Sequence, residues 1–135
     1  MSLFIDFAQV RPPDTPNTCL AAPEGLCQRA EPDLITPVVR KSPEALYHRL
    51  VGMAEQRRDW IELETDPDNL RLVFVARTAF LRFKDDVDIL VLPVPGLGDG
   101  EIGAQIAIYS RSRVGYSDLG ANRKRISALL ATLPT

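Results

Sequence analysis

The chain has 135 residues, a formal net charge of −2, 45% hydrophobic residues and 25% charged residues. This composition is typical of one globular domain over 1–135, and a chain of this length can fold without a metal or a disulfide. The charge gives no basic surface for nucleic acid, and no apolar run approaches the roughly 20 residues of a membrane span. The opening Met-Ser-Leu-Phe-Ile lacks the basic region and long apolar core of a signal peptide, so it indicates no compartment.

Residues 1–40 are rich in proline, which lacks the backbone amide donor and disfavours a helix. Apolar residues lie between the prolines, so we expect an extended arm that wraps around and packs on the core formed by 41–135. Both cysteines, Cys19 and Cys27, lie in this arm. They would form a disulfide in an oxidising compartment or stay buried thiols in a reducing one, and the sequence leaves both alternatives open.

The rest of the chain predicts two helices that flank four strands. The first helix begins at Ser42, a good N-cap, followed by Pro43 at a position where proline is favoured. The expected elements are a helix from Ser42–Pro43 to Arg57 or Arg58, strands over 60–64, 70–80, 87–94 and 102–112, and a helix from Ser117 or Asp118 to Pro134. Short connections favour an antiparallel order of sequential strands.

We therefore expect an α+β fold: a four-stranded antiparallel sheet with two helices packed on one face and a Pro-rich N-terminal arm. Side chains alternate between the two faces of a strand. The face toward the helices should carry Ile61, Leu63, Leu70, Leu72, Phe74, Ala76, Phe80, Val87, Ile89, Val91, Ile102, Ala104, Ile106 and Ile108. The open face should carry charges that alternate in sign from strand to strand, so that opposite charges pair. These are Glu62, Glu64, Arg71, Arg77, Asp86, Asp88, Arg111 and Arg113.

The segment 109–126 has the sequence YSRSRVGYSDLGANRKRI. It resembles the signature of the domain-of-unknown-function 1499 family, an uncharacterised bacterial family. Weaker similarities lie at 83–87 (FKDDV) and 16–20 (PNTCL). The resemblance implies no established reaction. It implies a periplasmic or membrane-tethered location, since many members are exported or tethered proteins of the cell envelope.

The signature segment contains the candidate ligand-binding residues: Arg111, Arg113, Asp118, Asn122 and Arg123. Helical spacing places Asn122 and Arg123 on the buried stripe, with Lys124 and Arg125 pointing elsewhere. One hypothesis is that the arginines and the helix start bind an anionic small molecule or a lipid head group. Against it, strand alternation places Arg111 and Arg113 on the face opposite the helix. The alternative is a polar network that stabilises the fold, with Asp85, Asp86 and Asp118 as partners.

The sequence predicts no catalytic residue, no metal site and no cofactor. The one histidine, His48, belongs to an amphipathic helix and is expected at its surface or boundary. Asp85 and Asp86 are adjacent on a strand, point to opposite faces and cannot act together on one bond. The glycine-rich loop 96–100 lacks the Lys and Ser/Thr of a phosphate loop. We expect a non-catalytic binding or structural module, with an enzyme of unknown reaction as the alternative.

Strand alternation also predicts an apolar centre on the open face of the sheet. It is formed by Trp60, Val73, Val75 and Tyr109, with charged residues around them. Such a face resembles an interface for a protein partner or for a second copy of the chain. The alternative is that the Pro-rich arm covers it.

Overall fold

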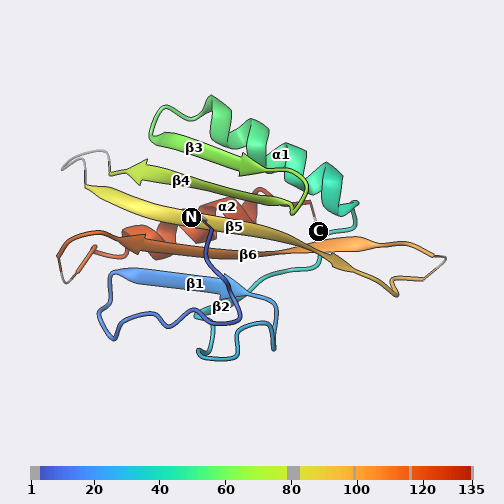
Figure 1. The fold of residues 1–135 in the computed structure, drawn as a ribbon, viewed down its shortest axis with the longest axis horizontal. Helices are drawn as coiled ribbons and strands as arrows, with labels where there is room; N and C mark the ends of the chain where they lie inside the picture. The colour runs from blue at the N-terminus through green and yellow to red at the C-terminus, as the bar shows by residue number, and fades with distance from the viewer. Residues whose placement is uncertain (1–3, 79–82, 99, 116, 135) are drawn as a thin grey trace.

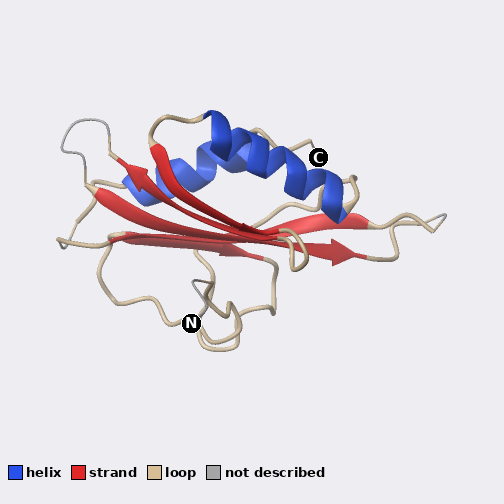
Figure 2. Cartoon of the chain, turned by 45° about the horizontal axis from the view of Figure 1, so that its top comes forward, coloured by secondary structure: helices blue, strands red, loops and turns tan. Residues whose placement is uncertain are grey.

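The computed structural model describes residues 4–78, 83–98, 100–115 and 117–134. The elements within these ranges are β1 (Thr18–Ala22), β2 (Leu34–Ile35), α1 (Pro43–Gln56), β3 (Trp60–Asp66), β4 (Arg71–Arg77), β5 (Lys84–Val94), β6 (Gly103–Ser112) and α2 (Ala121–Ala131). The strands form one six-stranded sheet in the order β2-β1-β6-β5-β4-β3 (Figure 1). Both helices cover one face, and the N-terminal segment lies against the other (Figure 2).

The prediction of a four-stranded antiparallel sheet was wrong, although the α+β class is consistent with the structure. The two additional strands come from the arm. Strand β1 pairs antiparallel with β6, and β2 pairs parallel with β1, so the sheet is mixed. The prolines of the arm flank β1 without interrupting it, since its sequence is Thr-Cys-Leu-Ala-Ala. Four of these five residues are buried, because the sheet continues on both sides of β1 and both of its faces are covered.

The remaining four strands neighbour each other in chain order, as the short connections predicted. Helix α1 also begins where expected: the Ser42 side chain accepts a hydrogen bond from the Ala45 amide at 3.1 Å. The helix ends at Gln56, one or two residues before the predicted end. Local capping chemistry therefore identified α1 without reference to the rest of the chain.

The predicted face of Trp60 was wrong because β3 contains a β-bulge. The β3–β4 register shifts between Ile61 and Glu64, and Glu62 has a φ of 54°. An extra residue at a bulge inverts the alternation beyond it. As a result Trp60 faces the helices together with Leu63, and Ile61 lies opposite Val75 on the open face. The Trp60 ring stacks on Phe74 with centroids 4.2 Å apart.

Most other predicted inward residues lie in the core between the sheet and the helices. Ile102 does not: it precedes β6, and 54% of it is exposed. Phe80 lies outside the described residues, as do Asp99 of the glycine-rich loop and Tyr116 of the signature segment.

The N-terminal arm covers the other face of the sheet over β1 and β6. Phe7 is buried there in a cluster with Leu20, Ala22, Ala107 and Tyr109. For Tyr109, the structure therefore agrees with the alternative that the Pro-rich arm covers the outward apolar residues. Trp60 lies on the helix side, so Trp60, Val73, Val75 and Tyr109 do not share one exposed surface. Association through this face stays a prediction.

The two cysteines are free thiols on opposite sides of the sheet. Cys19 belongs to the core under the helices, and Cys27 packs against the arm cluster on the other face. The two thiols are not joined in this structure, and the choice between the thiol and the disulfide alternatives in the native compartment stays a prediction. Burial, with a smaller contribution from Asp33, raises the pKa of Cys19 to about 11, so this thiol stays protonated at neutral pH.

Candidate functional site

A buried amide lies at the centre of the signature segment. The Asn122 side chain is fully buried at the start of α2. Its Nδ2 donates to the Asn17 carbonyl at 2.9 Å and to a carboxylate oxygen of Asp118 at 2.7 Å. Its Oδ1 accepts from the Ser110 hydroxyl at 2.6 Å and from Arg125 at 3.0 Å. One side chain therefore joins the arm, strand β6 and both ends of the β6–α2 connection.

Arg125 extends this network into the core beneath α2. Its guanidinium donates to Asp85 at 2.9 Å, and the exposed fractions of the two side chains are 12% and 1%. The prediction that Arg123 occupies the buried stripe was wrong, because Arg123 is exposed and Arg125 lies inward. The error came from including Leu119 in the helix. That residue precedes α2 with a φ of 55°, so the helical phase begins only after it.

Arg111 and Arg113 lie on the opposite face of the sheet. Arg111 pairs with Asp88 at 2.7 Å, and Arg113 pairs with Asp86 at 2.8 Å. These pairs confirm the predicted meeting of opposite charges for β5 and β6. The prediction does not extend to β3 and β4, because Glu62, Glu64, Arg71 and Arg77 form no ion pair with any described residue, and Arg71 donates to the Ile5 carbonyl instead. Burial raises the pKa of Asp88, against the hydrogen bond from Arg111 that lowers it.

The five candidate ligand-binding residues therefore do not converge. Arg111 and Arg113 lie across the sheet from Asn122, and Arg123 is exposed. The adjacent carboxylates separate as predicted, since Asp85 contacts Arg125 under α2 and Asp86 contacts the guanidinium of Arg113. Anion binding by these five residues together stays a prediction that the geometry does not favour.

Asp118 organises the turn that precedes α2. One carboxylate oxygen accepts from the Gly120 amide at 2.7 Å, and the other accepts from the Asn122 amide at 3.0 Å. Asp118, one of the two predicted capping residues, therefore satisfies amides at the helix start. Partial burial alone would raise the pKa of Asp118, but the hydrogen bonds from Asn122 and Gly120 outweigh it and lower the pKa.

We expect Asp118→Asn to lower the free energy of unfolding by about 1 kcal/mol at neutral pH, because asparagine has no negative charge at the helix start and only one acceptor oxygen for the two amides. Because the folded pKa of Asp118 lies below its unfolded value, its ionised form stabilises the fold above pH ~4. That contribution is lost as the pH falls through the folded pKa, so the two proteins should converge in acid. Urea unfolding at a series of pH values measures this, with Asp68→Asn in the exposed β3–β4 turn as control. A difference independent of pH would contradict it.

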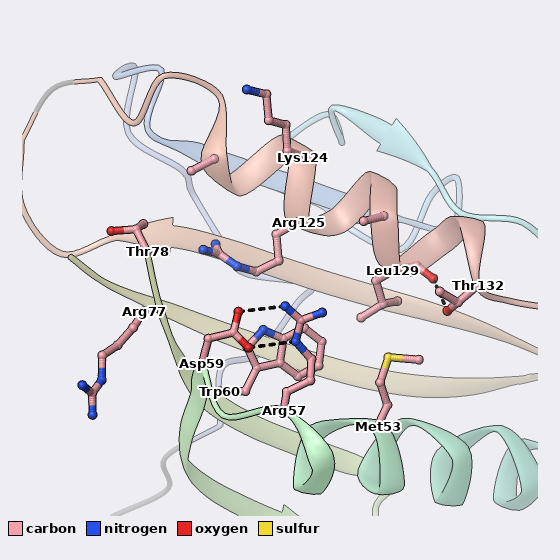
Figure 3. A pocket seen from close by; sticks show the side chains of 12 residues that line it. Met53, Arg57, Asp59, Trp60, Arg77, Thr78, Lys124, Arg125, Leu129 and Thr132 are labelled. Atoms are coloured by element: carbon pink, nitrogen blue, oxygen red, sulfur yellow. Dashed lines mark hydrogen bonds and ion pairs between the residues drawn. The ribbon is translucent and has the colours of Figure 1, made fainter. Parts of the chain in front are cut away.

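The concave site of interest lies on the helix side, close to the Asn122 network. It is a cleft of about 420 Å³ between the end of α1, the start of β3 and helix α2 (Figure 3). Its lining residues are Met53, Arg57, Asp59, Trp60, Arg77, Thr78, Ala121, Lys124, Arg125, Ala128, Leu129 and Thr132. Three of them, Ala121, Lys124 and Arg125, belong to the signature segment.

Charged and aromatic groups meet at one wall of the cleft. Arg57 donates two hydrogen bonds to the Asp59 carboxylate, at 2.9 and 2.7 Å. Its guanidinium also lies 4.6 Å from the centroid of the Trp60 ring. The hydrogen bond from Arg57 is the main cause that lowers the pKa of Asp59, and the positive charge of Arg125 adds to it. Asp59 is therefore an ionised carboxylate between two guanidinium groups.

The indole N–H of Trp60 is buried and has no hydrogen-bond partner among the described residues. Trp60 is only 7% exposed, so this donor lies in a largely buried side chain. An unpaired buried donor costs free energy that a bound acceptor would recover. Sequence reasoning missed this wall because the β3 bulge reverses the face of Trp60. The close spacing of Arg57, Asp59 and Trp60 was the available signal.

Comparison with known proteins identifies a family for this chain. A family model described as "Protein of unknown function (DUF1499)" matches residues 12–133. This match confirms the resemblance and includes the N-terminal PNTCL segment. No curated protein and no solved structure gives a significant match.

In the part of the chain that the structure describes, no helix has the length and apolarity needed to cross a bilayer. Within the same ranges no group of three or more His, Cys, Asp or Glu side chains is placed to hold a metal ion.

Proposed function

The chain belongs to the DUF1499 family, whose description assigns no function, and we propose from its geometry that it is a non-catalytic module that binds a small anionic molecule in the α1–α2 cleft. The observation that carries this proposal is a cleft whose lining has more basic than acidic side chains, with Trp60 in its wall and the indole N–H of Trp60 without a partner among the described residues.

The charge of the lining favours an anion. Arg57, Arg77, Lys124 and Arg125 line the cleft with one carboxylate, Asp59. The guanidinium of Arg57 and the side chain of Arg125 lie on either side of the cleft interior, while Lys124 and Arg77 point away from it (Figure 3). Asp59 and Asp85 neutralise part of the inner charge, and the outer cations add to the positive field at the rim.

The shape of the cleft favours a ligand with an apolar part. Met53 from α1 and Leu129 from α2 face each other across it. An apolar or aromatic group between these side chains would be buried, and its carboxylate or phosphate would lie near Arg57 and the Trp60 N–H. Asp59 has a lowered pKa and is a poor proton donor or base at neutral pH, which supports binding over catalysis.

Trp60 is the single tryptophan of the chain, so its fluorescence reports on this cleft directly. We expect phenyl phosphate or benzoate to change the emission in a saturable way, and neutral benzyl alcohol not to. Arg57→Gln should weaken the response about tenfold, a loss of about 1.4 kcal/mol. Arg58→Gln is the matched control, because Arg58 is exposed and absent from the lining.

Thermal unfolding of each variant shows whether it is folded. Arg57 is 48% exposed at its side chain, so its replacement should not unfold the protein. The proposal fails if neither anion produces a saturable change, or if Arg57→Gln and Arg58→Gln respond equally. The periplasmic or membrane-tethered location implied by the family resemblance is a separate proposal, which fractionation of cells expressing the native protein would test.

A further inference from the structure

Exposed apolar side chains project from the end of the molecule where β5 begins and β6 ends. Phe83 is 49% exposed, Val114 is 61% exposed and Leu119 is 85% exposed. The Arg113 amide donates to the Lys84 carbonyl at 3.3 Å, which continues the β5–β6 register and places Phe83 opposite Val114. The β6–α2 connection that carries Leu119 lies at this same end (Figure 1). We call Phe83, Val114 and Leu119 the apolar tip.

Leu119 has an unfavourable backbone conformation that its side chain does not explain. Its φ of 55° lies in the left-handed region, which costs a leucine conformational energy, and Gly120 follows with a φ of 81°. Asp118 and the buried Asn122 stabilise this turn. A leucine held in this way with little packing inside the molecule indicates a contact outside it.

Basic side chains surround the apolar tip in the sequence and in the structure. Lys84, Arg123 and Lys124 are exposed and form no ion pair with any described residue. Asp86 pairs with Arg113, whereas Asp118 accepts hydrogen bonds only from neutral amides and keeps its negative charge. Asp118 and the exposed Asp14 of the adjoining arm therefore offset part of these three positive charges. This end combines the apolar tip with a small excess of positive charge.

We propose that the apolar tip docks on an anionic lipid bilayer. Apolar side chains on loops enter the interfacial region, and the lysines and arginine contact the head groups. The tips lie on separate segments with charges between them, which suits a fluid surface better than a shaped protein partner. Ile35 and Ile102 are also exposed apolar residues, but Glu101, which precedes Ile102, pairs with Arg40 at 3.3 Å.

Sedimentation with lipid vesicles tests the proposal. We expect the protein to pellet with vesicles of phosphatidylcholine and phosphatidylglycerol at low salt, and not with phosphatidylcholine alone. Leu119→Asn combined with Phe83→Ser should weaken this binding about tenfold. Asparagine tolerates the left-handed conformation, so the variant keeps the turn while losing the apolar side chain. Lys84→Gln with Arg123→Gln should weaken binding and reduce its salt dependence.

The matched control is Ile35→Ser with Ile102→Ser, which removes exposed apolar side chains elsewhere and should leave vesicle binding unchanged. Circular dichroism confirms that each variant is folded. No sedimentation with anionic vesicles overturns the proposal. So does binding that depends on Lys84 and Arg123 but not on Leu119 and Phe83, which is simple electrostatic adsorption. Light scattering that shows a dimer lost in Phe83→Ser would assign the tip to self-association instead.

Discussion

Replacing Arg125 by alanine is expected to lower the free energy of unfolding by about 3–5 kcal/mol. The variant leaves the carboxylate of Asp85, which is 1% exposed, without its charged partner. The other Asp85 oxygen already has no hydrogen-bond partner among the described residues, so nothing there compensates for the loss. Urea unfolding followed by far-UV circular dichroism measures the difference.

The matched control is Arg123→Ala, two residues earlier on the same helix. Arg123 is exposed and takes part in no ion pair of the described chain, so its loss should change stability by no more than about 0.5 kcal/mol. Arg113→Ala should lower the free energy of unfolding by less than about 1 kcal/mol, because the Arg113 side chain is 43% exposed. Similar losses for Arg123 and Arg125 would show that the buried ion pair is not what stabilises α2 on the sheet.

A double variant separates the contribution of the Asp85–Arg125 ion pair from the cost of leaving one of its charges buried alone. Replacing Asp85 by leucine and Arg125 by methionine removes both charges and fills their space with apolar side chains. We expect this protein to recover most of the stability lost in Arg125→Ala, because an apolar pair avoids the unpaired buried charge. Failure to recover would mean that the hydrogen bonds of Arg125 to Ser110 and Asn122 contribute more than the ion pair.

The second large effect is expected at Asn122. We expect Asn122→Ala to lower the free energy of unfolding by about 3 kcal/mol, because it removes the hydrogen bonds that this buried amide makes to several polar groups at once. These include the carbonyl of Asn17 and the hydroxyls of Ser110 and Ser112, which the amide now joins. Urea unfolding is again the measurement.

Asn69→Ala is the control for this second effect. Asn69 donates to Asp66 at 2.7 Å in an exposed turn, where water replaces the lost hydrogen bond. Its replacement should cost no more than about 0.5 kcal/mol. If Asn122→Ala costs as little, the signature segment does not stabilise the fold through this amide, and its role must lie in what it presents to the outside.

The two variants also bear on the proposed cleft. Arg125 lines it, and Asn122 positions Arg125 through the hydrogen bond at 3.0 Å. Loss of stability in either variant would therefore mask a binding effect. Arg57 is the better residue for the ligand experiment, because its side chain is partly exposed and its pairing with Asp59 involves residues two apart in the chain.

Local chemistry alone determined several features of this protein. The capping residues identified the start of α1, and the short connections predicted the order of β3 to β6. Alternation along β5 separated Asp85 from Asp86, and the charges of β5 and β6 predicted the pairs with Arg111 and Arg113. Each of these depends on residues close in sequence or on strands that follow one another.

Tertiary structure alone decided the remainder. Strand β1 joins β6 about 90 residues away, as in the pairing of Thr18 with Arg111, and its short sequence has no clear strand signal. The bulge in β3 reverses Trp60. The left-handed turn at Leu119 excludes this residue from α2, so the helix buries the face of Asn122, Ile126 and Leu129, where Arg125 and not Arg123 points inward. Period-two and helical patterns assume an unbroken backbone, and one residue in an unusual conformation is enough to redirect every side chain beyond it.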